Sequence, residues 1–127
     1  MKRHILLQPL SQDHHHTLAL CVRVLRAPEC NHQAEIEPHL IDLEQHFQQE
    51  EQQFAPLWQY LPDDCLPLKQ RFEQEHAQLR ALFAAAQFDD ENWNKTFATS
   101  VRDHARFEER ELFPALEKYA LNQADNL

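Results

Sequence analysis

One pattern of histidine and glutamate occurs twice in this chain of 127 residues. Both copies read H-x-x-x-E-E-x-x-[FL]-x-P, and they begin at His46 and His104. Residues four apart lie on the same face of an α-helix, so His46 and Glu50 can reach one cation. The same holds for His104 and Glu108. Imidazole combined with carboxylate suits iron, manganese or zinc better than magnesium or copper(I), so the repeat predicts a transition-metal site.

Two further histidines extend this pattern, because each directly follows an acidic residue at the start of an apolar helical stripe. They are His14 and His76. The four histidines follow one another at intervals of roughly 30 residues, which corresponds to one helix and one connection in a bundle. We therefore expect one metal-binding histidine on each of four helices. His15 is the alternative to His14, although it points about 100° away from the apolar stripe.

Length, composition and net charge limit the classes of protein to which this chain can belong. A chain of this length forms one domain, residues 1–127, and the absence of glycine disfavours tight hairpins and phosphate-binding loops. A net charge of −9 without a basic stripe argues against nucleic acid and anionic membranes as partners. No apolar run is long enough for a membrane span or a signal peptide, so we expect a cytoplasmic protein with reduced cysteines. Cys21 is expected to be a small core residue.

The hydrophobic periodicity predicts an all-α protein with helices at about 11–27, 34–60, 68–87 and 91–121. Ser11 is the expected cap of the first helix, and Asp89 or Asp90 that of the fourth. Pro56 is expected to kink or end the second helix. The segment 61–67, which contains two prolines and two aspartates, is the clearest break.

A metal pair would offset an energetic cost that this arrangement otherwise carries. Buried imidazoles and carboxylates without partners cost several kcal/mol each, and bound dications reverse that cost. Two ions need about ten to twelve ligand positions, and four histidines with a bidentate or bridging Glu50 and Glu108 supply about eight. The remaining positions would be open to water, oxo or hydroxo groups, or a small molecule.

The chain resembles the hemerythrin-type, or HHE cation-binding, domain over nearly its whole length. The resemblance rests on the doubled H-x-x-x-E-E segment and on the two acid–histidine pairs. It implies an up-down-up-down antiparallel four-helix bundle around a non-haem di-iron centre that binds dioxygen, with zinc or manganese as substitutes for iron. The implied metal ligands are His14, His46, Glu50, His76, His104, and Glu108 or Glu109.

Two positions depart from the oxygen-carrying hemerythrins or remain open. Those proteins have a further histidine one turn before the position of His76, where this chain has Phe72. Glu73 is the nearest substitute, although a solvated surface glutamate is the simpler interpretation. The oxygen carriers place a carboxylate five residues after the last histidine, which corresponds to Glu109, whereas the internal repeat favours Glu108.

The expected function is therefore binding or sensing of O2, NO or peroxide, or of iron availability, without a catalytic residue. The alternatives are a di-iron enzyme, such as one for peroxide disproportionation or NO reduction, and an iron storage or handling protein. A monomer or a weak homo-oligomer is expected. His4 and His32 are expected at the surface, and His39, on the same face as His46, is expected to be partly exposed, with a hydrogen bond to a metal ligand as the alternative.

Overall fold

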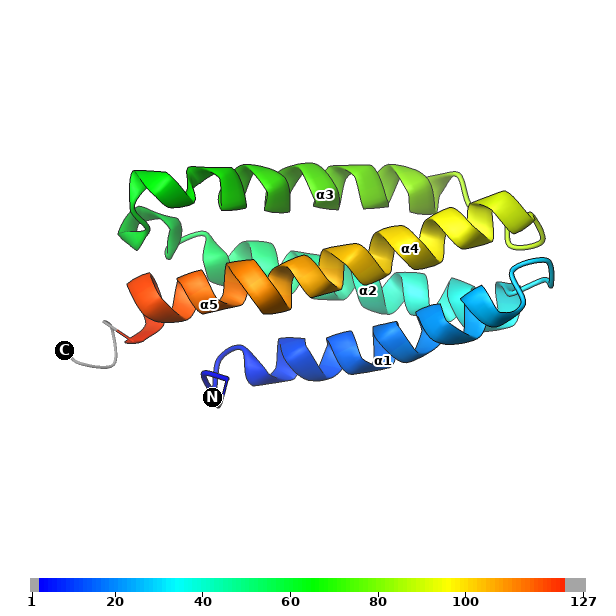
Figure 1. Ribbon diagram of the computed structural model, residues 1–127, viewed down its shortest axis with the longest axis horizontal. Coiled ribbons are helices and arrows are strands. Elements are labelled where there is room, and N and C mark those ends of the chain that lie inside the picture. Colours follow the sequence, from blue (N-terminus) through cyan, green and yellow to red (C-terminus); the bar gives the residue numbers. More distant parts are fainter. Residues whose placement is uncertain (1–2, 123–127) are drawn as a thin grey trace.

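The computed structural model describes residues 3–122, and this part of the chain is helical without a strand. Four long helices make up the fold: α1 (Gln8–Arg26), α2 (Gln33–Phe54), α3 (Leu66–Ala84) and α4 (Glu91–Phe107). Figure 1 shows them side by side, with the α1–α2 and α3–α4 connections at one end and the α2–α3 connection at the other. The prediction of an all-helical protein with four helices is confirmed.

The helix α1 begins earlier than the expected residue 11. Leu7 precedes its first residue and Pro9 lies in its first turn. Proline is favoured there, because the first N–H groups of a helix have no intrahelical acceptor. Ser11 therefore lies inside the helix, and the prediction that it caps α1 was wrong.

Two prolines set the break between α2 and α3. The helix α2 ends at Phe54, two residues before Pro56, and a 3-10 turn at Trp58–Tyr60 replaces the last helical turns that we expected up to residue 60. A second 3-10 turn, Asp63–Cys65, leads into α3, whose second residue is Pro67. The lost proline N–H explains why the chain cannot continue as one α-helix.

The fourth helical segment covers the expected residues 91–121 but contains two wider turns. The helix α4 is followed by a π turn at Glu108–Leu112, the short helix α5 (Phe113–Leu116) and a second π turn at Glu117–Leu121. The carboxylate of Asp90 caps α4 by accepting the Trp93 N–H at 2.7 Å, which decides between Asp89 and Asp90. Phe113 N–H bonds to Glu108 O, five residues back, immediately before Pro114 interrupts the backbone ladder.

The core consists of two apolar clusters with a polar layer between them. The first cluster includes Cys21, as expected, and lies toward the end with the α1–α2 and α3–α4 connections. The second includes Phe54, Phe72 and Phe113 and lies toward the α2–α3 connection. Buried histidines and glutamates occupy the layer that separates them. The two clusters hold the helices together, so the polar layer is positioned by packing on both sides.

Both ends of the bundle carry further features. Near the α3–α4 connection, the buried Asn94 side-chain NH2 donates to the carbonyls of Pro28, Cys30 and Phe88 at 2.9, 3.1 and 3.0 Å. His32 is also buried there and bonds to Ala27 O, so its predicted surface position was wrong.

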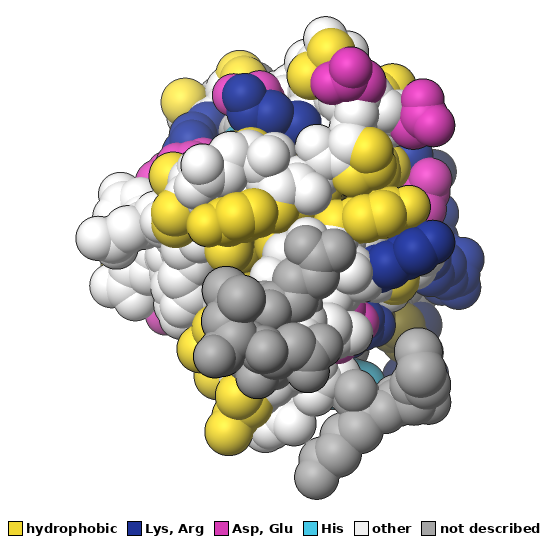
Figure 2. Space-filling model, turned by 90° about the vertical axis from the view of Figure 1, so that its left-hand side faces the viewer, with side chains coloured by type: hydrophobic (Ala, Val, Ile, Leu, Met, Phe, Trp, Pro, Cys, Tyr) yellow, Lys and Arg dark blue, Asp and Glu magenta, His cyan; other side chains and the backbone are white. Residues whose placement is uncertain are grey.

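At the opposite end, Figure 2 shows hydrophobic side chains gathered at the surface. Within residues 3–122, no helix is both long and apolar enough to cross a membrane.

Candidate metal centre

Six buried side chains meet in the polar layer and form two groups that could each hold an ion. In each group, the candidate ligand atoms lie within 4.8 Å of one another. Glu50 and Glu108 belong to both groups, and each group adds two histidines. The first group contains His14 and His46, and the second contains His76 and His104. The structure therefore brings together all six residues that the sequence suggested, one histidine from each helix.

Each shared glutamate directs its two oxygens toward different groups. Glu50 Oε2 lies 3.2 Å from His46 Nε2, and Glu50 Oε1 lies 3.2 Å from His76 Nε2. Glu108 Oε1 lies 2.9 Å from His14 Nε2, and Glu108 Oε2 lies 3.4 Å from His104 Nε2. Both carboxylates thus face the two groups at once, as carboxylates that bridge two ions do.

Most of these atoms lack a hydrogen-bond partner within the described part of the chain. The unpartnered buried atoms of the centre are Nε2 of His46, His76 and His104, both oxygens of Glu50, and Oε2 of Glu108. Several lie close to one another, as the distances above show, but without the alignment of a hydrogen bond. Unpaired buried polar atoms are costly, so their convergence fits a site for cations. The donor set of imidazole and carboxylate suits iron, manganese or zinc.

The electrostatics of the metal-free centre favour protonated imidazoles. Burial alone would lower the pKa of His14, but hydrogen bonds to Glu108 and Glu109 outweigh it and raise the pKa to about 9. Burial likewise opposes the charge on His46, but its bond to Asp13 and the nearby carboxylates of Glu108 and Glu50 raise its pKa to about 12. For His104, the attraction of Glu108 overcomes burial and raises the pKa to about 10. Protons therefore balance the buried carboxylates until a cation replaces them.

The two shared glutamates differ in their own titration. Burial and the nearby charge of Glu108 raise the pKa of Glu50. Burial also acts to raise the pKa of Glu108, but the charge of His104, the bond from His14 and the nearby His46 lower it well below its ordinary value. The pKa values of these two neighbouring carboxylates are thus shifted in opposite directions.

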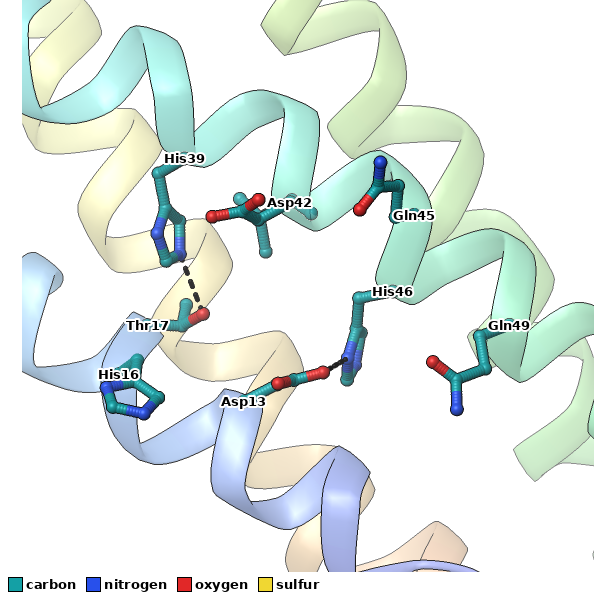
Figure 3. Close-up of a pocket in the computed structure, with 9 residues that line it drawn as sticks. Asp13, His16, Thr17, His39, Asp42, Gln45, His46 and Gln49 are labelled. Carbon is teal, nitrogen blue, oxygen red and sulfur yellow. Dashed lines mark hydrogen bonds and ion pairs between the residues drawn. The ribbon is translucent and has the colours of Figure 1, made fainter.

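Each histidine also has an outward nitrogen, Nδ1, that faces a carboxylate of a neighbouring helix. Glu109 lies 2.6 Å from His14 Nδ1, and Asp13 lies 3.0 Å from His46 Nδ1, as Figure 3 shows for the second pair. The corresponding distances are 2.7 Å between Glu51 and His76, and 2.7 Å between Glu75 and His104. An ionised carboxylate only accepts, so Nδ1–H is the donor in all four contacts.

The residues that the sequence left as alternatives lie in different places in the structure. His14 is buried in the centre whereas His15 is exposed. Glu108 is completely buried among the candidate ligand atoms, and Glu109 lies behind His14 instead. The side chain of Glu73 is 60% exposed and lies 4.0 Å from Lys69, so it is not part of the centre.

Phe72 takes the place expected for a further histidine and packs against the centre. It is buried, and its ring centroid lies 4.1 Å from that of His76. Phe47 stacks on the same imidazole at 4.2 Å. His76 therefore contacts two apolar rings, which restrict its orientation.

A polar groove between α1 and α2 reaches the outer edge of His46. Its volume is about 520 Å³. Figure 3 shows Asp13 and His46 in this groove, together with a hydrogen bond of 2.9 Å between Thr17 Oγ1 and His39 Nε2. His39 thus contacts α1 and does not belong to either group of candidate ligands.

Sequence reasoning identified the inward residues but not the roles of their neighbours. Asp13 and Glu75 were noted only as the acidic halves of acid–histidine pairs, and Glu51 was noted only as part of the repeat. The available signal was that an acidic residue adjoins a candidate ligand at four places in the chain. What it left open was which histidine each acid contacts, because that partner lies on another helix.

Comparison with known proteins agrees with this geometry. The family model described as "Hemerythrin HHE cation binding domain" matches residues 6–116. This range contains all six candidate ligands and the four carboxylates behind the histidines. Neither the curated proteins nor the solved structures yielded a match.

Proposed function

Because the chain belongs to the hemerythrin HHE cation-binding domain family, we propose that its two groups of buried ligands hold a pair of iron ions. His14 and His46 would hold one ion, and His76 and His104 the other. Glu50 and Glu108 would bridge them. Zinc or manganese, which share these ligand preferences, are the expected substitutes when iron is scarce.

The arrangement of the two glutamates carries the proposal of two ions. A single ion at His14 and His46 would leave Nε2 of His76 and His104 unpartnered, and a single ion at His76 and His104 would leave Nε2 of His46 unpartnered. With two ions, every inward nitrogen and all four glutamate oxygens have a partner. Burial of unpartnered polar atoms is costly, so the pair is favoured over a single ion.

We also take the bundle to be up-down-up-down and antiparallel. The connections in Figure 1 alternate between the two ends of the molecule. The positions of the outer carboxylates support the same topology. On α1 and α3 the acid precedes the inward histidine by one residue, whereas on α2 and after α4 it follows the inward glutamate by one. A step of one residue turns in opposite senses on antiparallel helices, so this alternation directs all four acids the same way round the bundle.

Binding of a small ligand is the function that this centre supports best. Each group offers two imidazole nitrogens and two carboxylate oxygens, which leaves about two positions on an ion that prefers about six ligands. Bound iron would supply a redox-active Lewis acid for O2, NO or peroxide. Phe47, Phe72 and Phe113 surround the histidines with apolar rings, and such surroundings favour small ligands of low charge.

A binding or sensing role is favoured over an enzyme that turns over peroxide or NO. Proton-coupled turnover needs an acid or base beside the reacting ligand. Among the described residues, the carboxylates next to the centre either belong to the two groups or contact the outer nitrogens of the histidines. The physiological ligand, O2, NO or peroxide, would then be bound and not consumed.

Anaerobic titration of metal-free protein with iron(II) tests this function. Elemental analysis after removal of loose metal should give two irons per chain, and loading should raise the melting temperature, because ligands that bind only the native state stabilise it. Subsequent exposure to O2 or NO should change the optical spectrum. Trace metal with an unchanged melting temperature would refute the metal centre, and loaded protein with no response to either gas would refute the ligand-binding role.

A further inference from the structure

Four carboxylates surround the candidate metal centre, and together they link the helices in a closed cycle. Asp13 on α1 contacts His46 on α2, and Glu51 on α2 contacts His76 on α3. Glu75 on α3 then contacts His104 on α4. Glu109, which follows α4, completes the cycle at His14 on α1. We call these four acids the carboxylate ring: Asp13, Glu51, Glu75 and Glu109.

Each contact fixes one imidazole in the state that a metal ion requires. A carboxylate at Nδ1 keeps the proton on that nitrogen, so that Nε2 can present its lone pair inward once a cation displaces the second proton. The contact also sets the rotation of the imidazole about its bond to the backbone. Without it, a buried histidine can turn or carry its proton on Nε2, and either change removes a metal ligand.

Arginines hold three members of the ring from outside. Arg80 bonds to Glu51 at 2.7 Å, Arg71 bonds to Glu75 at 2.7 Å, and Arg3 lies 3.2 Å from Glu109. The guanidinium of Arg71 also lies 4.2 Å from the Phe107 ring centroid. Among the described residues Asp13 has no arginine partner, and it faces the polar groove instead. Three carboxylates of the ring therefore lie between an arginine and a histidine, whereas the Asp13 carboxylate, within residues 3–122, pairs only with its histidine, His46.

We propose that the carboxylate ring is a set of positioning residues, which orient the four histidines of the metal centre and hold their Nδ1 protons. This inference rests on the proposed metal-binding function, but it assigns a role to four residues that are not ligands. It also explains why an acid stands next to an inward residue at four places in the sequence. Each helix then supplies candidate ligands to the shared centre and, one residue away, the acid that orients the histidine of the next helix.

The arginines provide matched controls for the test. Arg71 bonds to Glu75 and also to Glu111 at 3.2 Å, but only Glu75 contacts a histidine. Arg80 similarly bonds to both Glu51 and Glu44, and only Glu51 contacts a histidine. Substitution of either glutamate in a pair removes one partner of the same arginine. The two members of a pair therefore differ mainly in their contact with the metal centre.

The probe is cobalt(II), bound in competition with a chromophoric chelator to full-length protein. We expect Glu75→Leu, which removes the acceptor, to weaken cobalt binding by about 100-fold, and Glu75→Gln, which keeps a neutral acceptor, by about tenfold. Glu111→Leu and Glu111→Gln should remain within about twofold of the wild type. Glu51→Gln and Glu44→Gln should differ in the same direction.

A second measurement, on metal-free protein, separates this inference from the proposed function. Nitrogen-15 spectra of the imidazoles should show a hydrogen-bonded Nδ1–H for His104 that Glu75→Leu abolishes and Glu111→Leu preserves. If the wild type bound no cobalt, the proposed function would fail, and these spectra would still decide whether the ring orients the imidazoles. Equal cobalt affinities for the Glu75 and Glu111 variants, in a wild type that binds two ions, would overturn the positioning role and leave the metal centre intact. Survival of the His104 signal in Glu75→Leu would overturn it as well.

Discussion

Substitutions at one histidine and at one shared glutamate should have different effects on the number of bound ions. His46 belongs to only one group of candidate ligands, whereas Glu108 belongs to both. His46→Ala should therefore remove one ion and leave the ion at His76 and His104. Glu108→Gln should weaken both ions, because the amide NH2 replaces the oxygen that faces one ion and only a neutral amide oxygen faces the other.

The size of the effect follows from the number of ligands that each ion loses. Loss of a partner that only supports a metal ligand costs about 10 to 100-fold in affinity, so loss of the ligand itself should exceed about 100-fold. That factor corresponds to about 2.7 kcal/mol for one ion and about 5.4 kcal/mol for two. With roughly 4 °C of melting temperature per kcal/mol for a domain of this size, His46→Ala should lose about 10 °C of the metal-induced rise. Glu108→Gln should lose about 20 °C.

Differential scanning calorimetry with and without iron(II) measures these changes under anaerobic conditions. The comparison within each variant cancels the effect of the cavity or the lost hydrogen bonds on the metal-free protein. His15→Ala serves as the control, because His15 is exposed next to His14 and should keep both ions and the full rise. The reasoning would be refuted if Glu108→Gln kept two ions, or if His46→Ala and His15→Ala behaved alike.

The remaining predictions concern Phe72 and the metal-free centre. Phe72→His should make oxygen binding more reversible, because a histidine one turn before His76 can reach the same ion. Stopped-flow mixing with O2 followed by argon purging measures the reversibility. Full recovery of the reduced spectrum in the wild type would contradict this prediction. Phe72→Ala should lower the free energy of unfolding by about 3 to 5 kcal/mol, since the Phe72 side chain is buried among Phe54, Trp58 and His76. Urea unfolding measures the loss, and a change below about 1 kcal/mol would argue against this packing. In the metal-free protein, the pKa values of His14 and His104 are raised from 6.5 to about 9 and about 10, so their stabilisation is complete below about pH 6.5 and is lost as the pH rises through 9 to 10. Unfolding of chelator-treated protein should show this decline from pH 7 to 10, and an increase in stability over that range would contradict it.

The sequence determined the fold class and the inward residues because both depend on the period of a single helix. Apolar residues that recur every three or four positions predicted the four helices, and the same period placed His46 and Glu50 on one face. The prolines predicted the end of α2, since a missing N–H acts on the residues next to it. The doubled H-x-x-x-E-E segment was specific enough to indicate the family over most of the chain.

Helix boundaries were less predictable. The first helix begins before the expected residue because Pro9 starts it, although Ser11 offered a plausible cap. The wider turn that follows Glu108 had no clear signal apart from Pro114. Local propensities compete at such places, and the packing of the bundle decides between them.

Only the tertiary structure decided how the helices share the centre. The sequence could not show whether Glu108 or Glu109 points inward, nor that Asp13 contacts the histidine of another helix. These pairings depend on the rotation of each helix about its axis and on the distance between neighbours. A shift of one residue turns a side chain by about 100°, which separates a ligand from the residue that supports it. The packing of the two apolar clusters fixes that rotation, and it thereby determines which acids face the centre and which face the histidines of the next helix.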